Sequence, residues 1–169
     1  MDFIEAALFD LKRTKAMVER AVSQLSDQEL HRQIDPESNS VAVLMKHIAG
    51  NMLSRWTDFL TSDGEKPTRN RDGEFIDEFK TRDELMAFWE RGWTCALHAI
   101  ESLTPDDLTR TVHIRSEPHS VPLAIMRQFG HYSSHAGQIV FLAKHLRGAE
   151  WKTLSIPRNR STTQAPRYQ

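Results

Sequence analysis

Four long segments of this chain repeat apolar side chains every three or four residues, and that spacing constrains the fold more than any other feature. The segments cover about residues 2–25, 40–60, 81–103 and 122–147. A period of three to four residues gathers apolar side chains on one face of an α-helix, and that face must be buried against other elements. Four such helices of about 20 residues each predict an all-α protein, and more specifically a four-helix bundle.

Short polar signals mark where these helices begin and end. Thr81 and Glu84 have the spacing of a capping box before the third helix. Ser38 and Asn39 are candidate caps for the second helix. Gly148 is the expected stop of the fourth helix, because glycine adopts the left-handed conformation that often follows a last turn.

The connections predict the topology. Residues 61–80 are polar and contain Gly64, Pro67 and Gly73. Twenty extended residues can reach about 66 Å, whereas a 20-residue helix is about 30 Å long, so this crossover could run the length of the bundle and let the second and third helices lie parallel. Residues 104–121 contain two short extended runs that could form a small hairpin before the fourth helix. We expect one bundle domain over residues 1–148 and a C-terminal extension over 149–169 that is partly ordered at most.

Charge and composition exclude several classes of protein. With 22 basic and 23 acidic side chains, the chain lacks the positive charge typical of a nucleic-acid-binding protein. A single cysteine excludes an internal disulfide framework. The first residues do not have the pattern of a signal peptide, and no apolar run approaches the roughly 18 residues of a membrane span. We therefore expect a cytoplasmic protein with neither nucleic acid nor membrane as a partner.

Eight histidines in 169 residues raise the question of which of them lie together. His131 and His135 are four residues apart on the fourth helix, and His47 lies between Leu44 and Ile48 on the inward face of the second. Taken alone, His47 could be an ordinary hydrogen-bonded core residue. Three inward imidazoles would be costly as a bare polar cluster, however, and one divalent ion can accept all three lone pairs. The pattern predicts a metal site made of His47, His131 and His135.

These motifs resemble the DinB-like superfamily, which includes the YfiT-type proteins and the bacillithiol and mycothiol S-transferases. The resemblance covers about residues 1–147 and rests on the histidine in KHIAGNM and the H-x3-H pair in GHYSSHAGQIVFLAK. Residues 50–72 and 154–161 look like a branch whose function has not been assigned. The resemblance implies an up-down-down-up four-helix bundle with His47, His131 and His135 as the metal ligands, and a homodimer.

A site of three neutral histidines leaves at least one coordination position open, which is typical of catalytic sites. An ion there could acidify a bound water or hold a thiolate. We therefore expect one divalent ion per chain, zinc or nickel, in an enzyme that acts on a small molecule, either as an S-transferase using a low-molecular-weight thiol or as a hydrolase. The alternative is a non-catalytic metal-binding protein, stress-associated or interacting with another protein, and a vestigial site is a third reading.

Six polar residues are candidates to support the ligands or to bind substrate. Asn51, Gln128 and Gln138 lie near the histidines along their helices, and Arg55 follows His47 by about two turns. Arg69 and Arg71 could fold over the site and hold an anionic substrate such as a carboxylate. The plain alternatives are polar residues at a bundle end and a solvated crossover with paired charges.

The remaining chemically interesting side chains have structural interpretations. Trp56, Trp89 and Trp93 are expected to pack in the core. Cys95 has no evident acid–base partner and is expected to be a small buried group rather than a nucleophile. The other five histidines (His31, His98, His113, His119 and His145) are assigned to surface or structural roles.

Overall fold

The computed structural model describes residues 1–160, and over these residues the chain is mostly helical. Its elements are five α-helices, two strands and three 3-10 turns. The helices are α1 (Phe3–Val22), α2 (Asp27–Leu30), α3 (Val41–Trp56), α4 (Arg82–Glu101) and α5 (Val121–Arg147); the strands are β1 (Thr111–Ile114) and β2 (Glu117–Ser120); the 3-10 turns are η1 (Asp72–Phe75), η2 (Pro105–Thr109) and η3 (Gly148–Glu150). The predicted helical fold with a small hairpin is confirmed in these terms.

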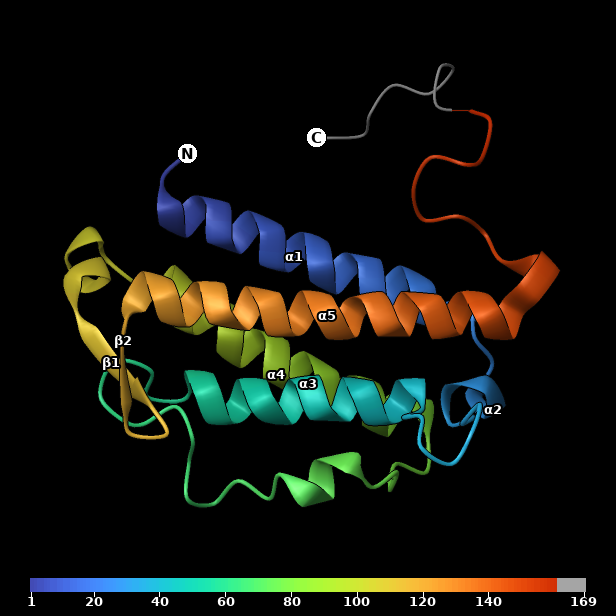
Figure 1. Cartoon of the computed structure of the whole chain (residues 1–169), viewed down its shortest axis with the longest axis horizontal. Coiled ribbons are helices and arrows are strands. Elements are labelled where there is room, and N and C mark those ends of the chain that lie inside the picture. The colour runs from blue at the N-terminus through green and yellow to red at the C-terminus, as the bar shows by residue number, and fades with distance from the viewer. Residues whose placement is uncertain (161–169) are drawn as a thin grey trace.

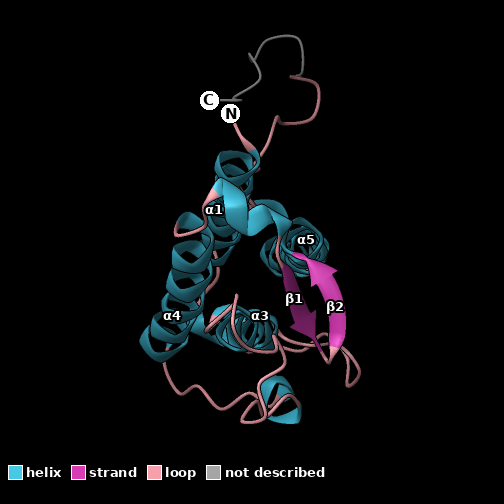
Figure 2. Ribbon diagram, turned by 90° about the vertical axis from the view of Figure 1, so that its left-hand side faces the viewer, coloured by secondary structure: helices cyan, strands magenta, loops and turns pink. Residues whose placement is uncertain are grey.

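The four long helices run side by side, α1 and α5 in one direction and α3 and α4 in the other (Figure 1). Viewed along their axes, they surround a common centre (Figure 2). The crossover of residues 61–80 returns along α3 to the end where α3 began, so α4 can start there and run parallel to α3 (Figure 1). Within the described residues, no helix is both long and apolar enough to cross a membrane.

The helix starts differ in detail from the predicted caps. The cap of α3 is Ser40, whose side chain accepts a hydrogen bond from the amide of Val43, and not Ser38 or Asn39. Thr81 caps α4 by accepting from the amide of Glu84, as predicted. The carboxylate of Glu84, however, accepts from the amide of Lys80 instead of that of Thr81, so only half of the capping box forms.

The end of α3 and the short helix α2 differ from the sequence-based expectation. The α3 helix ends at Trp56 rather than near residue 60, because Thr57 is extended and Asp58 takes a positive φ of 50°. The four-residue helix α2 lies in the connection after α1 and is closed by a capping box between Ser26 and Glu29. A helix this short has no apolar period, so the periodicity that located the long helices could not reveal it.

The α3 helix is the centre of the core and is buried on almost every side. Trp56, Trp89 and Trp93 are at most 2% exposed, which confirms their assignment to the core. The α3 and α4 helices approach so closely that a Cβ on Gly92 would lie 2.7 Å from Cα of Ala49. The close packing of the two parallel helices therefore requires glycine at position 92.

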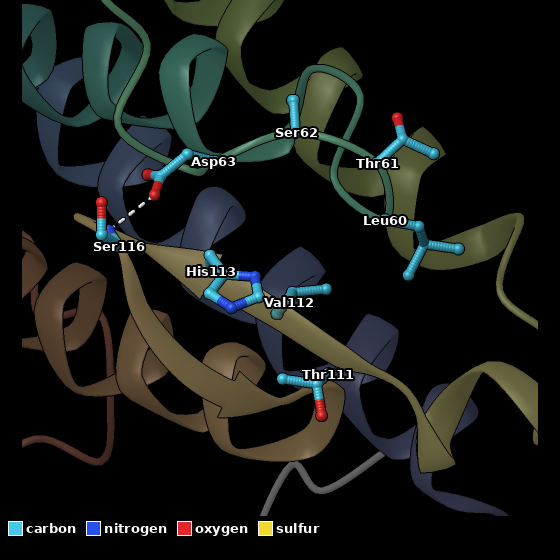
Figure 3. A pocket seen from close by; sticks show the side chains of 8 residues that line it. All are labelled: Leu60, Thr61, Ser62, Asp63, Thr111, Val112, His113 and Ser116. Atoms are coloured by element: carbon cyan, nitrogen blue, oxygen red, sulfur yellow. Dashed lines mark hydrogen bonds between the residues drawn. The ribbon is translucent and has the colours of Figure 1, made fainter.

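The hairpin is fastened to the start of the crossover by Asp63 (Figure 3). Its carboxylate accepts hydrogen bonds from the backbone amides of Arg115 (2.9 Å) and Ser116 (2.7 Å), which form the turn between β1 and β2. Figure 3 draws the bond between Asp63 and Ser116. Both turn residues have positive φ, 56° and 63°, as the tight turns of two-residue hairpins require. The amide of Gly64 also donates to the carbonyl of His113. These contacts hold Arg115 beside the start of the crossover.

The segment after α5 is attached to the helices near its start. Gly148, with a φ of 52°, ends α5 as predicted. The backbone of Lys152 then makes two hydrogen bonds with the side-chain amide of Gln24. Residues 161–169 of the predicted C-terminal extension lie outside the described residues.

Candidate metal centre

The side chains of His47, His131 and His135 converge from two helices. His47 lies on α3, and His131 and His135 lie one turn apart on α5. The Nε2 atom of His131 is 3.1 Å from Nε2 of His47 and 3.2 Å from Nε2 of His135. Ligands held about 2.0–2.1 Å from one tetrahedral ion are about 3.3 Å apart, so the three nitrogens have nearly the separation that a single ion needs. The structure thus brings the three predicted ligands into one group that could hold a metal ion.

The hydrogen bonds behind the rings determine which nitrogen carries the lone pair. Nδ1 of His47 lies 2.8 Å from a carboxylate oxygen of Glu74, which can only accept, so Nδ1 donates and Nε2 is left with its lone pair. Nδ1 of His135 similarly lies 2.8 Å from Oε1 of Gln138. Two lone pairs therefore face Nε2 of His131, which can donate a hydrogen bond to only one of them. A cation among the three nitrogens removes this conflict, so the donor set fits a divalent ion.

The same surroundings keep the imidazoles of His131 and His135 neutral, as metal ligands must be. Burial, together with the neighbouring His135 and His47, lowers the pKa of His131 to about 3. Burial also lowers the pKa of His135, although its hydrogen bond to Gln138 partly opposes the change. Both rings are therefore in the ligating form at neutral pH.

Glu74, which the sequence analysis did not single out, is the residue that orients His47. It lies on η1 in the crossover, and its side chain is only 7% exposed. Burial by itself would raise the pKa of Glu74, but hydrogen bonds from His47 and Arg69 outweigh burial and lower it. A Cβ on Gly50 would lie 2.8 Å from Oε1 of Glu74, so a glycine on α3 makes room for the carboxylate. A carboxylate that accepts from the far nitrogen of a ligating histidine is a recurrent arrangement in metal sites.

Arg69 holds Glu74 in place. Its Nε and Nη2 donate to the two oxygens of Glu74 at 2.7 and 2.8 Å, and its Nη1 donates to Glu65. The sequence predicts that Arg69 holds a substrate or, alternatively, pairs with charges of the crossover, and in the structure two carboxylates bind its guanidinium. Arg71, the other predicted clamp, is exposed and lines the cavity described below.

Contacts on either side of Glu74 attach the crossover to α3. The buried ammonium of Lys46 donates to the carbonyls of Gly73 (2.7 Å) and Ile76 (2.9 Å). The ring of Phe75 stacks on the imidazole of His47 with 4.6 Å between the ring centroids. These contacts explain why a polar linker without periodicity can place a carboxylate reproducibly behind a ligand.

A cavity of about 180 Å³ opens beside the histidines. His47 and His131 form part of its wall, and seven other residues complete it: Asn51, Arg55, Arg69, Arg71, Arg115, Arg127 and Gln128. Five of the six predicted supporting residues are thus gathered around this cavity. Arg115 and Arg127 were not predicted, because they come from the hairpin and the start of α5, which only the fold brings to this place.

The three predicted amide side chains have different surroundings. Gln138 makes the hydrogen bond to His135 described above. Asn51 accepts from the hydroxyl of Tyr132 (3.1 Å), which in turn accepts from the indole of Trp56. Gln128 is 3% exposed, and its Oε1 has no hydrogen-bond partner.

The other reactive side chains in the described residues lie outside this centre. His31 pairs with Asp77, and His119 contacts Arg127. Cys95 is half-buried with its sulfur 3.6 Å from the hydroxyl of Thr57.

Comparison with known proteins adds a family but no activity. A family model described as a protein of unknown function, DUF1572, matches residues 1–160. No curated protein matches the chain. The DinB-like superfamily is not named by this match, so that resemblance stays a prediction.

Proposed function

The chain belongs to the DUF1572 family, whose description assigns no activity, and we propose that it is a metal-dependent enzyme acting on a small molecule. The proposed centre is one divalent ion, zinc or nickel, on His47, His131 and His135. Transfer of a low-molecular-weight thiol or hydrolysis is the proposed reaction. One observation carries the proposal: the hydrogen bonds that Nδ1 of His47 and Nδ1 of His135 donate to Glu74 and Gln138 orient two imidazole lone pairs toward the third ring.

The finer fold assignment belongs to the same proposal. Two helices running each way, with a long crossover between the parallel pair, are what an up-down-down-up four-helix bundle of the DinB-like type would have. We also propose a homodimer in the cytoplasm. The apolar side chains of α4 do not supply a surface for this dimer, because Trp89 and Trp93 are buried and Phe88 packs against Phe79.

A divalent ion bound by three neutral imidazoles supplies Lewis-acid chemistry, lowering the pKa of a water or thiol that it binds. The chain's own residues prepare the site for it. Glu74 and Gln138 hold the tautomers of His47 and His135, and Arg69 keeps Glu74 ionised and fixed. Arginines on the cavity wall favour an anionic reactant.

A non-catalytic metal-binding protein is the second candidate, and one observation favours it. Among the described residues, those lining the cavity include no carboxylate that could act as a general base. The carboxylate nearest the ligands, Glu74, is already engaged by His47 and Arg69. If the second candidate is right, metal should raise stability without conferring any turnover.

Metal content and activity should be measured on the same preparation. Elemental analysis of purified protein is expected to give close to one divalent ion per chain. The loaded protein should then be screened with low-molecular-weight thiols against electrophiles and with ester and amide substrates, using His131→Ala as the metal-deficient control. Turnover that depends on the ion supports the enzyme, full loading without turnover supports the second candidate, and absence of binding under metal supplementation refutes both.

A further inference from the structure

The cavity beside the histidines carries an unusual excess of positive charge. Five of its nine lining residues are arginines, and none is acidic. The carboxylates of Glu65 and Glu74 lie behind the wall and are bound mainly by Arg69. A divalent ion on the histidines would add to this positive charge, so the electrostatic potential of the cavity favours the binding of an anion.

Arg55 is the least satisfied of these arginines. Its side chain is 6% exposed, and neither Nε nor Nη1 has a hydrogen-bond partner. Its nearest acid is Glu65, 3.6 Å from Nη2, and Glu65 also serves Arg69 and Arg115. Burial therefore lowers the pKa of Arg55, and the negative charge of Glu65 is too weak to restore it. A buried guanidinium with unpaired donors is destabilising unless a ligand supplies the acceptors.

Gln128 is a second buried group without a partner on the same wall. It is 3% exposed and its Oε1 makes no hydrogen bond. Its amide can accept from a ligand or, turned by 180°, donate to one. Two almost fully buried side chains thus have polar atoms without a hydrogen-bond partner, on a wall that also contains two metal-ligand candidates.

We propose that this cavity binds the oxyanion group of a small organic acid, with Arg55 as its buried anchor and Arg127 at the exposed rim. The inference deepens the proposed function, on which it rests, by naming the substrate class: an anion held directly beside the metal centre. A volume of about 180 Å³ corresponds to about six water molecules, so it accepts a carboxylate or phosphate with a few attached atoms. Arg127 is 43% exposed, and its Nη1 contacts His119 and Glu117, so it lies at the open side of the cavity.

Calorimetric titration of the full chain, zinc-loaded and metal-free, would test this assignment. The probes are succinate, inorganic phosphate and uncharged succinamide, which matches succinate in size. We expect saturable binding of succinate or phosphate and none of succinamide. The stronger of the two anions shows whether the oxyanion is a carboxylate or a phosphate.

Three matched variants locate the anion. Arg55→Met should raise its Kd about 10- to 100-fold, because charge-assisted hydrogen bonds are lost in a buried place. Arg127→Met, at the rim, should raise it several-fold. Arg32→Met removes an exposed arginine that does not line the cavity, and it should leave the anion Kd unchanged. Because two of the three guanidinium nitrogens of Arg55 are buried without a partner in the free protein, Arg55→Met should also keep or raise the melting temperature. An arginine that stabilises the fold would instead lower the melting temperature when it is replaced.

Each outcome decides the question. Anion binding by Arg55→Met as tight as by the parent would mean that the ion alone holds the anion, and would overturn the inference, as would absence of anion binding in the parent. If Arg55→Met fails to fold, the anion Kd of Arg127→Met decides the question. A Kd equal to that of Arg32→Met would then refute the inference. Metal content, measured separately, keeps the two proposals distinct: loss of the metal site with anion binding retained refutes only the proposed function.

Discussion

Replacing Glu74 with glutamine isolates the contribution of the carboxylate behind His47. The change preserves the size of the side chain but removes the negative charge of the carboxylate, to which both His47 and Arg69 donate hydrogen bonds of 2.7–2.8 Å. Loss of such a supporting carboxylate weakens metal binding about 10- to 100-fold in known metal sites. We expect a zinc Kd raised by that factor in Glu74→Gln.

The same change should also destabilise the fold. Breaking a buried ion pair by removing one partner costs about 3–5 kcal/mol, and because Arg69 keeps its contact with Glu65 we expect the lower end of that range. Chelator competition would give the zinc affinity, and urea unfolding of the metal-free protein would give the free energy of unfolding.

Glu65→Gln is the matched control for this experiment. It also takes a carboxylate from Arg69, at 3.1 Å, but Glu65 has no contact with His47 among the hydrogen bonds of the described residues. It should therefore reduce stability while leaving zinc affinity near that of the parent. Unchanged zinc affinity in Glu74→Gln would refute the role given to Glu74. An equal loss of affinity in both variants would attribute the effect to general loosening of the crossover.

Three further predictions follow from the same contacts. His47→Ala should sharply reduce metal content, since two ligands on one helix hold an ion less firmly than three; full occupancy by elemental analysis would remove His47 from the site. The metal-free protein should lose stability as the pH falls below about 6.5. The reason is that the unfolded chain then protonates His131, whereas the folded state, in which the pKa of His131 is lowered to about 3, keeps it neutral. A urea midpoint that falls as much between pH 7 and 5 in His131→Gln as in the parent would contradict this. The exposed Leu123, Met126 and Phe141 on α5 should be covered in a homodimer, so light scattering should give about twice the 19.5 kDa chain mass, and a mass of one chain at micromolar concentration would reject the dimer.

Part of the site could be predicted because it depends on position along a helix. Residues four apart on a helix share a face, so His131 and His135 had to be neighbours wherever α5 packed. The inward position of His47 followed from the apolar residues around it. Gln138, three residues after His135, could be predicted for the same reason and does bond to that ring.

The rest of the site depends on contacts between segments distant in sequence. Glu74 is 27 residues from His47, in a linker with no periodicity, and only the attachment of the crossover by Lys46 brings it behind the ring. Arg69 was predicted at the site but with another role, because the sequence did not reveal that two carboxylates would engage it. Arg115 depends on the hairpin turn and on Asp63, which fastens that turn to the crossover.

The sequence by itself determined the four long helices, the parallel pair that the long crossover permits, and the three histidines. All of these follow from local periodicity and from chain length. Only the tertiary structure decided the tautomers of the histidines, the anchoring of Glu74 and the gathering of arginines around one small cavity. The physical reason is that hydrogen bonds and desolvation act over a few ångströms in space, and a polar linker carries no local pattern that records which side chains it will meet.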